Sequence, residues 1–193
     1  DKPWGLWTVE RTPEIANIVQ SIVDRDGWVS GNALAIIMKG QNQGPSEREP
    51  KREFEAFENI SDPEDGGDGQ HHQERIPRLI VYYTMDDTDF SMSEISIVKN
   101  GEQVSDSIFV EDEDGNDVFH SVVTFDLSSD DAEEIHNVLA DEHEIDDLND
   151  DDLDLGWEGE AEDFNIVNVG LRFQDIQIPQ GSEIYRAYLE VTS

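Results

Sequence analysis

The stretch Arg78–Thr84 reads Arg-Leu-Ile-Val-Tyr-Tyr-Thr and carries the clearest strand signal in the sequence. Its β-branched and aromatic residues favour an extended backbone. The run Asn32–Met38 is almost continuously apolar, which predicts a central strand buried on both faces. Residues 164–173 and 184–191 predict two more strands, because Ile178-Pro179-Gln180-Gly181 between them has the composition of a turn. The core is therefore expected to be built from sheets.

A weaker strand pattern follows in the middle of the chain. Residues 95–98 and 107–110 predict a hairpin around Asn100-Gly101. Residues 118–125 predict a further strand. The middle of the chain is thus expected to be a β-meander.

Two segments are expected to be mainly loops. Residues 41–73 lack periodicity and are anchored only at Phe54, Phe57 and Ile60. Residues 141–154 carry too much charge for a core segment, although a short strand could begin at Leu153 and Leu155.

One amphipathic helix is expected ahead of the strands. Thr12-Pro13-Glu14 has the composition of a helix N-terminus, with Thr12 as the cap. Apolar residues then recur on one helical face: Ile15, Ile18, Val19, Ile22 and Val23. Together these elements predict an all-β fold, a jelly-roll-like β-sandwich with one amphipathic helix and long acidic loops.

Charge narrows the classes of partner. Forty-seven acidic residues against 12 basic ones give a formal net charge of -35, and no Lys or Arg occurs in residues 100–171. Nucleic acid and anionic membranes carry the same sign of charge and are poor partners. Calcium is the expected cofactor, since hard cations take carboxylate oxygens as ligands. The alternative is that the acidity reflects only a highly saline habitat.

Other classes are excluded by what the sequence lacks. There is no cysteine, so a disulfide framework and thiolate metal sites are ruled out. No segment approaches the roughly 20 apolar residues of a membrane span, so no membrane insertion is expected. Because the sequence starts at Asp1 without Met or a signal pattern, we expect a mature or excised fragment.

The sequence also predicts that the chain is not an enzyme. No nucleophile elbow, phosphate-binding loop or zinc-protease motif is present. Acidic pairs are too numerous for any one of them to indicate a glycosidase. The five histidines lack the spacing of a structural zinc site and are interpreted as surface residues.

Residues 111–117 hold the sharpest ligand pattern. Their oxygens can converge on one cation as in the first part of a calcium loop, because Gly115 permits a sharp turn. The candidate ligands are Asp112, Asp114, Asn116 and Asp117. Ser121 stands where an EF-hand with Gly115 as its loop glycine would place its bidentate Glu. A calcium-binding loop and an acidic turn that binds nothing are the two interpretations.

Two blocks of the chain resemble the two halves of a known module. One block lies late in the sequence, at residues 128–134 (Ser-Ser-Asp-Asp-Ala-Glu-Glu), 169–173 (Val-Gly-Leu-Arg-Phe), 178–181 and 187–189. The other lies early, at residues 11–15, 27–34 (Gly-Trp-Val-Ser-Gly-Asn-Ala-Leu) and 77–83. They resemble the opening and closing halves of β-sandwich modules in large secreted proteins of marine and environmental microbes. These modules are similar to the disaggregatase-related, DNRLRE-like carbohydrate-binding modules.

The resemblance implies a jelly-roll-like sandwich whose halves come in permuted order. Residues 1–84 would be the closing half, residues 85–125 a connecting β-hairpin or meander, and residues 126–193 the opening half. The halves could close within one chain or between neighbouring chains, or the sequence could span a boundary in a tandem array. Closure between chains would let copies polymerise head to tail by strand complementation.

The resemblance also implies a metal site. Related jelly rolls often hold a structural calcium near the first strand, which extends this role to Asp131 and Glu133. In an extended strand these two side chains share one side and Asp130 takes the other. Solvated charge is the alternative interpretation.

Surface chemistry completes the expected function. Trp4 and Trp7 are candidates for a sugar-stacking surface, with burial as the other interpretation. Asn59-Ile60-Ser61 matches a glycosylation acceptor. We expect an extracellular or cell-surface, calcium-stabilised building block with a structural or adhesive role, whose partners are copies of itself or neighbouring repeats. The alternative is a carbohydrate-binding module with polysaccharide as its partner.

Overall fold

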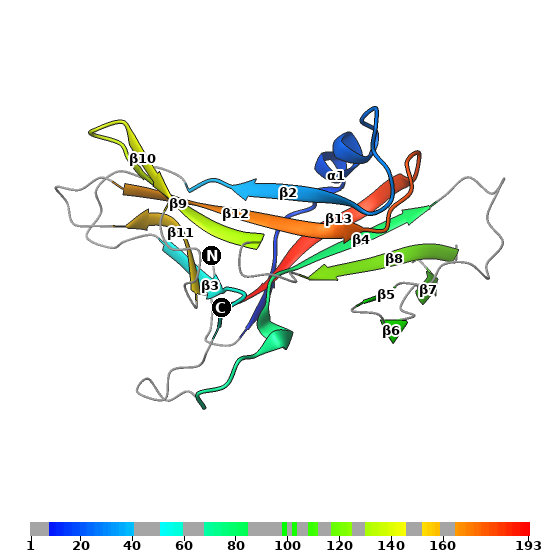
Figure 1. Cartoon of the computed structure of the whole chain (residues 1–193), viewed down its shortest axis with the longest axis horizontal. Coiled ribbons are helices and arrows are strands. Elements are labelled where there is room, and N and C mark those ends of the chain that lie inside the picture. Colours follow the sequence, from blue (N-terminus) through cyan, green and yellow to red (C-terminus); the bar gives the residue numbers. More distant parts are fainter. Residues whose placement is uncertain are drawn as a thin grey trace.

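The computed structural model shows two antiparallel sheets and one α-helix (Figure 1), which confirms the predicted all-β, sandwich-like fold. The described residues are 8–40, 51–59, 68–84, 98–99, 102–103, 108–111, 117–124, 130–145, 152–158 and 165–193. Between residues 98 and 124 the backbone of the strands is described, together with the side chain of Val123. None of the helices in the described residues is long and apolar enough to cross a membrane.

One sheet has five strands in the order β1-β13-β4-β8-β7, with every pair antiparallel. Its strands are β1 (Val9–Arg11), β13 (Glu183–Thr192), β4 (Arg78–Thr84), β8 (Asp117–Thr124) and β7 (Ile108–Glu111). The predicted strand at Arg78–Thr84 therefore lies in the middle of this sheet.

The other sheet has six strands and is organised around β12. Its strands are β10 (Glu142–Ile145), β9 (Asp131–Asn137), β12 (Asn165–Ile176), β11 (Asp152–Glu158), β3 (Lys51–Glu55) and β2 (Asn32–Met38). Strand β9 pairs along one side of β12. The other side of β12 is shared by two strands. Strand β11 pairs with residues 165–167 of β12, and β2 pairs with residues 169–176.

The predicted hairpin in the middle of the chain has different partners from those expected. Strand β5 (Val98–Lys99) pairs with β6 (Glu102–Gln103), and the predicted turn at Asn100-Gly101 lies outside the described residues. The strand near residues 107–110 is β7, which pairs with β8 rather than with β5. The sequence pattern located β7 and β8 to within one residue but not their pairing, and of the predicted strand at residues 95–98 the structure describes only Val98, in β5.

Helix α1 (Ala16–Val23) packs against β13 and begins later than predicted. Thr12 does not cap the helix, because its Oγ1 accepts a hydrogen bond from the Leu189 N–H at 3.0 Å. Glu14 Oε1 accepts hydrogen bonds from the Ala16 N–H at 2.9 Å and the Ala187 N–H at 2.5 Å. Both side chains thus attach the start of the helix to the sheet.

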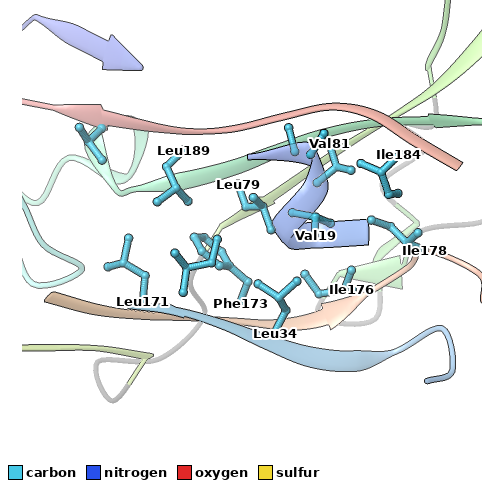
Figure 2. Packing of buried hydrophobic residues seen from close by; sticks show 14 of the residues in the cluster. Val19, Leu34, Leu79, Val81, Leu171, Phe173, Ile176, Ile178, Ile184 and Leu189 are labelled. Carbon is cyan, nitrogen blue, oxygen red and sulfur yellow. The ribbon is translucent and has the colours of Figure 1, made fainter. Parts of the chain in front are cut away.

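The core lies between the two sheets and is closed on one side by α1 (Figure 2). Side chains from both sheets and the helix meet there: Val19, Leu34, Leu79, Val81, Leu171, Phe173, Ile176, Ile178, Ile184 and Leu189. Trp28 closes one end by donating its Nε1–H to the Ile178 carbonyl at 2.9 Å. Ile18, which was expected on the buried face of the helix, is 50% exposed.

Two sequence expectations about strands were wrong. Strand β2 is buried on one face only, with Leu34 and Ile36 inside and Ile37 67% exposed, and β12 is its only strand partner in the described residues. Strand β3 lies within the segment expected to be a loop, where Phe54 is its buried residue. The 3-10 helix η2 (Gln73–Arg75) follows in the same segment.

The early and late blocks of the chain pair with each other inside one chain. Strand β13 lies between β1 and β4, and β12 pairs with β2. The residues at the two ends of the described chain are also neighbours: the Thr8 N–H donates to the Ser193 carbonyl at 3.1 Å and the Ser193 N–H to the Thr8 carbonyl at 3.0 Å. The structure thus shows closure within one chain, with the strand at residues 181–191 folded back on its own sheet.

Candidate metal centre

Three carboxylates are buried where β9 begins. Asp130, Asp131 and Glu133 are 2%, 3% and 6% exposed. Asp131 lies opposite Leu171 and Glu133 opposite Val169, which are core residues of β12. Because directly opposed residues of an antiparallel pair share a face, the side chains of Asp131 and Glu133 lie on the core side of the sheet. This is the shared side that the alternation predicts.

Asp130 has a different environment. Gln174 Nε2 lies 2.8 and 2.9 Å from its two carboxylate oxygens. Gln174 follows the core residue Phe173 in β12 and therefore points away from the core. Asp130 is thus held on the opposite side of the sheet from Asp131, also as predicted.

A short loop after β3 brings a fourth carboxylate to Asp131. The Phe57 N–H donates to Asp131 Oδ2 at 2.8 Å. The next residue, Glu58, has both carboxylate oxygens buried, and neither has a hydrogen-bond partner within the described residues. A buried carboxylate without a hydrogen-bond donor is costly, so a cation beside Glu58 would stabilise the folded chain.

The pKa of Asp131 also reflects a buried site that holds more than one carboxylate. The pKa of Asp131 is raised to about 7, chiefly by burial and to a smaller extent by the like charges of Glu58 and Asp130, while the hydrogen bond from the Phe57 N–H opposes the shift. Near neutral pH the carboxyl is therefore balanced between its protonated and ionised forms. A bound divalent cation would favour the ionised form.

The backbone of β11 contributes a hydrogen bond to Glu133. The Asp154 N–H donates to Glu133 Oε1. Asp154 Oδ2 pairs with Lys51 Nζ at 2.7 Å, whereas Asp154 Oδ1 is buried without a hydrogen-bond partner among the described residues.

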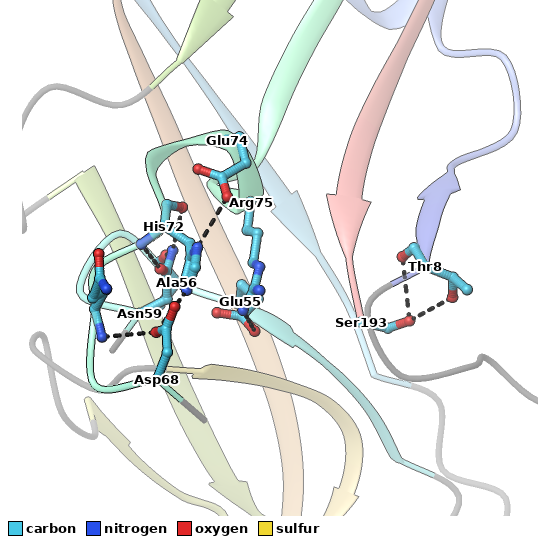
Figure 3. A network of polar contacts seen from close by, with 10 residues as sticks. Thr8, Glu55, Ala56, Asn59, Asp68, His72, Glu74, Arg75 and Ser193 are labelled. Carbon is cyan, nitrogen blue, oxygen red and sulfur yellow. Dashed lines mark hydrogen bonds and ion pairs between the residues drawn. The ribbon is translucent and has the colours of Figure 1, made fainter. Parts of the chain in front are cut away.

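Asn59 holds the loop that carries Glu58 (Figure 3). Its Nδ2 donates to the carbonyls of Ala56 at 2.8 Å and His72 at 3.2 Å, and its Oδ1 accepts from the His72 N–H at 2.8 Å. The His72 ring lies between Glu74 Oε1 at 2.9 Å and Asp68 Oδ1 at 3.1 Å, and these two bonds raise the pKa of His72. The loop is thereby fixed against η2.

These contacts correct the prediction that Asn59 is glycosylated. The Asn59 side chain is fully buried, and both ends of its amide are used in hydrogen bonds. A glycan needs an accessible amide nitrogen, so the folded chain cannot carry one here. Asn59 has a structural role.

The donor chemistry at the start of β9 fits a hard cation. Calcium takes six to eight oxygen ligands, including main-chain carbonyls and water as well as carboxylates. Asp131, Glu133 and Glu58 do not form a set of three ligand atoms that all lie within 4.8 Å of one another; among the described residues His136, Asp141 and His143 form such a set, which is described below. A calcium ion beside Asp131 and Glu58 would therefore take several ligands from the main chain or water.

The other predicted sites lie mostly outside the described residues. This holds for Asp112, Asp114 and Asn116 of the acidic loop and for Trp4 and Trp7. Asp117 begins β8 opposite Glu111, and its side chain is not among those described. Sequence reasoning proposed Asp131 and Glu133, which the structure buries on one side of β9, but did not propose Glu58, because only the fold brings residue 58 to residue 131.

The outer face of the five-stranded sheet forms a second polar surface, which we call the Arg–Tyr face. The Arg11 guanidinium lies 4.7 Å from the centre of the Tyr188 ring, and that of Arg186 lies 5.5 Å from Tyr188 and 5.6 Å from Tyr82. Tyr185 packs at 5.9 Å from Tyr82, centre to centre. Basic and aromatic side chains thus gather on one face of a strongly acidic chain.

Buried Glu190 anchors this face. Arg11 Nε donates to Glu190 Oε2 at 3.0 Å, and Arg78 donates to its other oxygen. The hydrogen bond to Glu190 raises the pKa of Arg11. One carboxylate therefore holds two guanidinium groups in place.

The segments that carry the resemblance have clear places in the fold. Residues 27–34 form the turn into β2, residues 169–173 lie in the middle of β12, and residues 187–189 lie in β13. The family resemblance itself stays a prediction. Comparisons of the chain with protein-family models, curated proteins and solved structures find no match.

Proposed function

We propose that this chain is a calcium-stabilised β-sandwich module with a structural or adhesive role outside the cell, and that it is not an enzyme. The observation that carries the proposal is the Glu58 carboxylate, which is buried beside Asp131 without a hydrogen-bond donor in the described residues. Two neighbouring buried carboxylates repel each other unless a proton or a cation lies between them. At neutral pH a divalent cation is the more effective stabiliser of the pair.

The position of these residues supports a structural role for the ion. Asp131 is in β9, which lies next to the edge strand β10 of the six-stranded sheet. Glu58 is in the loop after β3, which is the strand at the opposite edge in the strand order. An ion between them would link two segments that are far apart in sequence. Because it would bind only the folded chain, a concentration of 100 times its Kd would stabilise the fold by about 2.7 kcal/mol.

Thermal unfolding with and without calcium tests this proposal. Millimolar calcium should raise the Tm well above the value in sodium chloride of equal ionic strength, and Glu58→Gln should remove most of that increase. Asp26→Asn is the matched control, because Asp26 is exposed beyond the end of α1. If Glu58→Gln and Asp26→Asn respond to calcium alike, the ion is not bound beside Asp131.

Association with copies of itself is part of the proposed role. Strand β13 is paired on both sides within its own chain, so exchange of residues 181–191 is not the proposed route. Strand β2 pairs only with β12 in the described residues and carries exposed Ile37, which are features of an edge that can accept another strand. Ile37→Lys should reduce assembly seen by light scattering, whereas Ile145→Lys on β10 is the control for an added charge.

The Arg–Tyr face favours carbohydrate binding as a second candidate function. Tyrosine rings stack on sugars, and guanidinium groups pair with carboxylate or sulfate substituents. Because Arg11 and Arg186 make this face locally basic on an otherwise acidic chain, the ligand class would be an acidic polysaccharide, such as one built from uronic acids. Arg186→Ala should weaken retention of the chain on such a polysaccharide in affinity electrophoresis, and unchanged retention would exclude this face.

A further inference from the structure

Two histidines face each other across the β9–β10 hairpin. His136 of β9 and His143 of β10 are directly opposed in the register, so their side chains share one face of the sheet. Their rings stack with centres 4.1 Å apart and planes tilted by 10°. This arrangement brings a ring nitrogen of each histidine within 4.8 Å of the other.

The turn between these strands adds a carboxylate. Asp141 Oδ1 lies 3.6 Å from His136 Nε2. Ligand atoms of His136, Asp141 and His143 all lie within 4.8 Å of one another. Asp141 has a φ of 54°, in the left-handed region, and Asn137 stabilises the turn by accepting hydrogen bonds from the N–H groups of Leu139 and Ala140.

One nitrogen in this group calls for a ligand. His136 Nε2 is buried and has no hydrogen-bond partner in the described residues. An unpaired buried nitrogen beside a carboxylate and a second imidazole is unfavourable without a proton or a metal ion. This observation is independent of the spacing of the three side chains.

His143 is oriented as metal ligands usually are. Its Nδ1 lies 3.0 Å from Glu134 Oε1, and Glu134 Oε2 accepts a hydrogen bond from Asn168 Nδ2 at 2.9 Å. A Glu134 carboxylate bonded to Nδ1–H leaves the lone pair of His143 on Nε2, the arrangement of a carboxylate–histidine–metal triad.

We propose that His136, His143 and Asp141 form a binding site for a zinc-class divalent ion. Two imidazole nitrogens and one carboxylate suit zinc, nickel or copper rather than calcium, which prefers oxygen. The ion would fasten β10, all four of whose residues are exposed, to the rest of the six-stranded sheet. The site shares no residue with the proposed calcium site, so each stands or fails alone.

Zinc titration against a chromophoric chelator tests the site. The buffer contains millimolar calcium, which occupies the many carboxylates that would otherwise bind zinc weakly. The intact chain should bind one zinc ion, and His143→Gln should weaken binding at least tenfold. Glu134→Gln should weaken it by about 10-fold while leaving the ligands in place. Glu142→Gln removes a neighbouring exposed charge and should change the affinity less than twofold.

Hydrogen exchange provides the second measurement. Zinc should slow amide exchange in β9 and β10 of the wild type and not in His143→Gln. The side chain of His143 is 50% exposed and lies outside the hydrophobic core, so its replacement should leave the fold intact. Loss of zinc binding in calcium, equal binding by His143→Gln and Glu142→Gln, or unchanged exchange in β10 would each overturn the proposal.

Discussion

Asp131→Asn keeps the shape of a buried side chain and removes its charge, so it measures the cost of ionising a carboxylate inside the sandwich. The amide oxygen of Asn can still accept the hydrogen bond from the Phe57 N–H. Burial raises the pKa of Asp131 from 3.8 to about 7. Each pH unit of this interval is worth about 1.4 kcal/mol, so full ionisation costs the folded state about 4 kcal/mol.

The sign of the effect follows from proton binding. The folded chain binds a proton at Asp131 more tightly than the unfolded chain does. The stability that this proton contributes is complete below pH 3.8 and is lost as the pH rises through about 7. Wild-type protein should therefore lose stability relative to Asp131→Asn over this range.

Urea unfolding in the presence of a chelator, from about pH 4.5 to about pH 8, measures the difference. The free energy of unfolding of the wild type should fall by about 3 kcal/mol or more relative to Asp131→Asn. Exposed Asp26→Asn should run parallel to the wild type. Calcium should flatten the wild-type curve. Parallel curves for wild type and Asp131→Asn would refute the reasoning.

Three further substitutions test the packing. Gly40→Ala should destabilise the fold by about 2 kcal/mol in urea unfolding, because the added Cβ would lie 2.5 Å from the Val167 carbonyl oxygen. Gly170→Ala is the control and should be tolerated, because its Cβ would lie 3.9 Å from its nearest neighbour. Equal effects of the two substitutions would contradict this. Phe173→Ala should cost about 3 to 5 kcal/mol, since the ring is fully buried, and a loss below about 1 kcal/mol would show that the core is loosely packed. Glu190→Gln should cost about 1 kcal/mol at low salt and less at high salt, because it releases two partly exposed arginines; a salt-independent cost would point to packing instead.

The sequence was sufficient to place strands whose apolar residues are continuous. Arg78–Thr84 and Asn32–Met38 have the predicted bounds because β-branched and large apolar residues dominate them. The burial of β2 was predicted wrongly, since Ala33 and Ala35 count as apolar although they face outward. Strand β3 was missed because Phe54 is the one apolar residue among charged neighbours.

The candidate sites likewise include residues that the sequence pattern can predict and residues that only the fold brings together. Asp131 and Glu133 could be paired from sequence because alternation within one strand fixes which side chains share a face. Glu58 could not be added, since its place depends on how β3 and β9 are arranged in the sheet. The two histidines of the hairpin were dismissed because their spacing resembles no known motif, yet the register of β9 and β10 opposes them directly.

The buried carboxylates also bear on why the chain is so acidic. Adaptation to salt alone would place carboxylates at the surface, where hydration and screening make them tolerable. Asp131 and Glu133 lie on the core side of a sheet, where concentrated monovalent salt screens them poorly. If salt adaptation were the whole explanation, concentrated potassium chloride with chelator should restore full stability. We expect potassium chloride to raise the free energy of unfolding of Asp131→Asn and of the wild type by the same amount. The difference in stability between the two proteins should therefore remain in potassium chloride and disappear only in calcium.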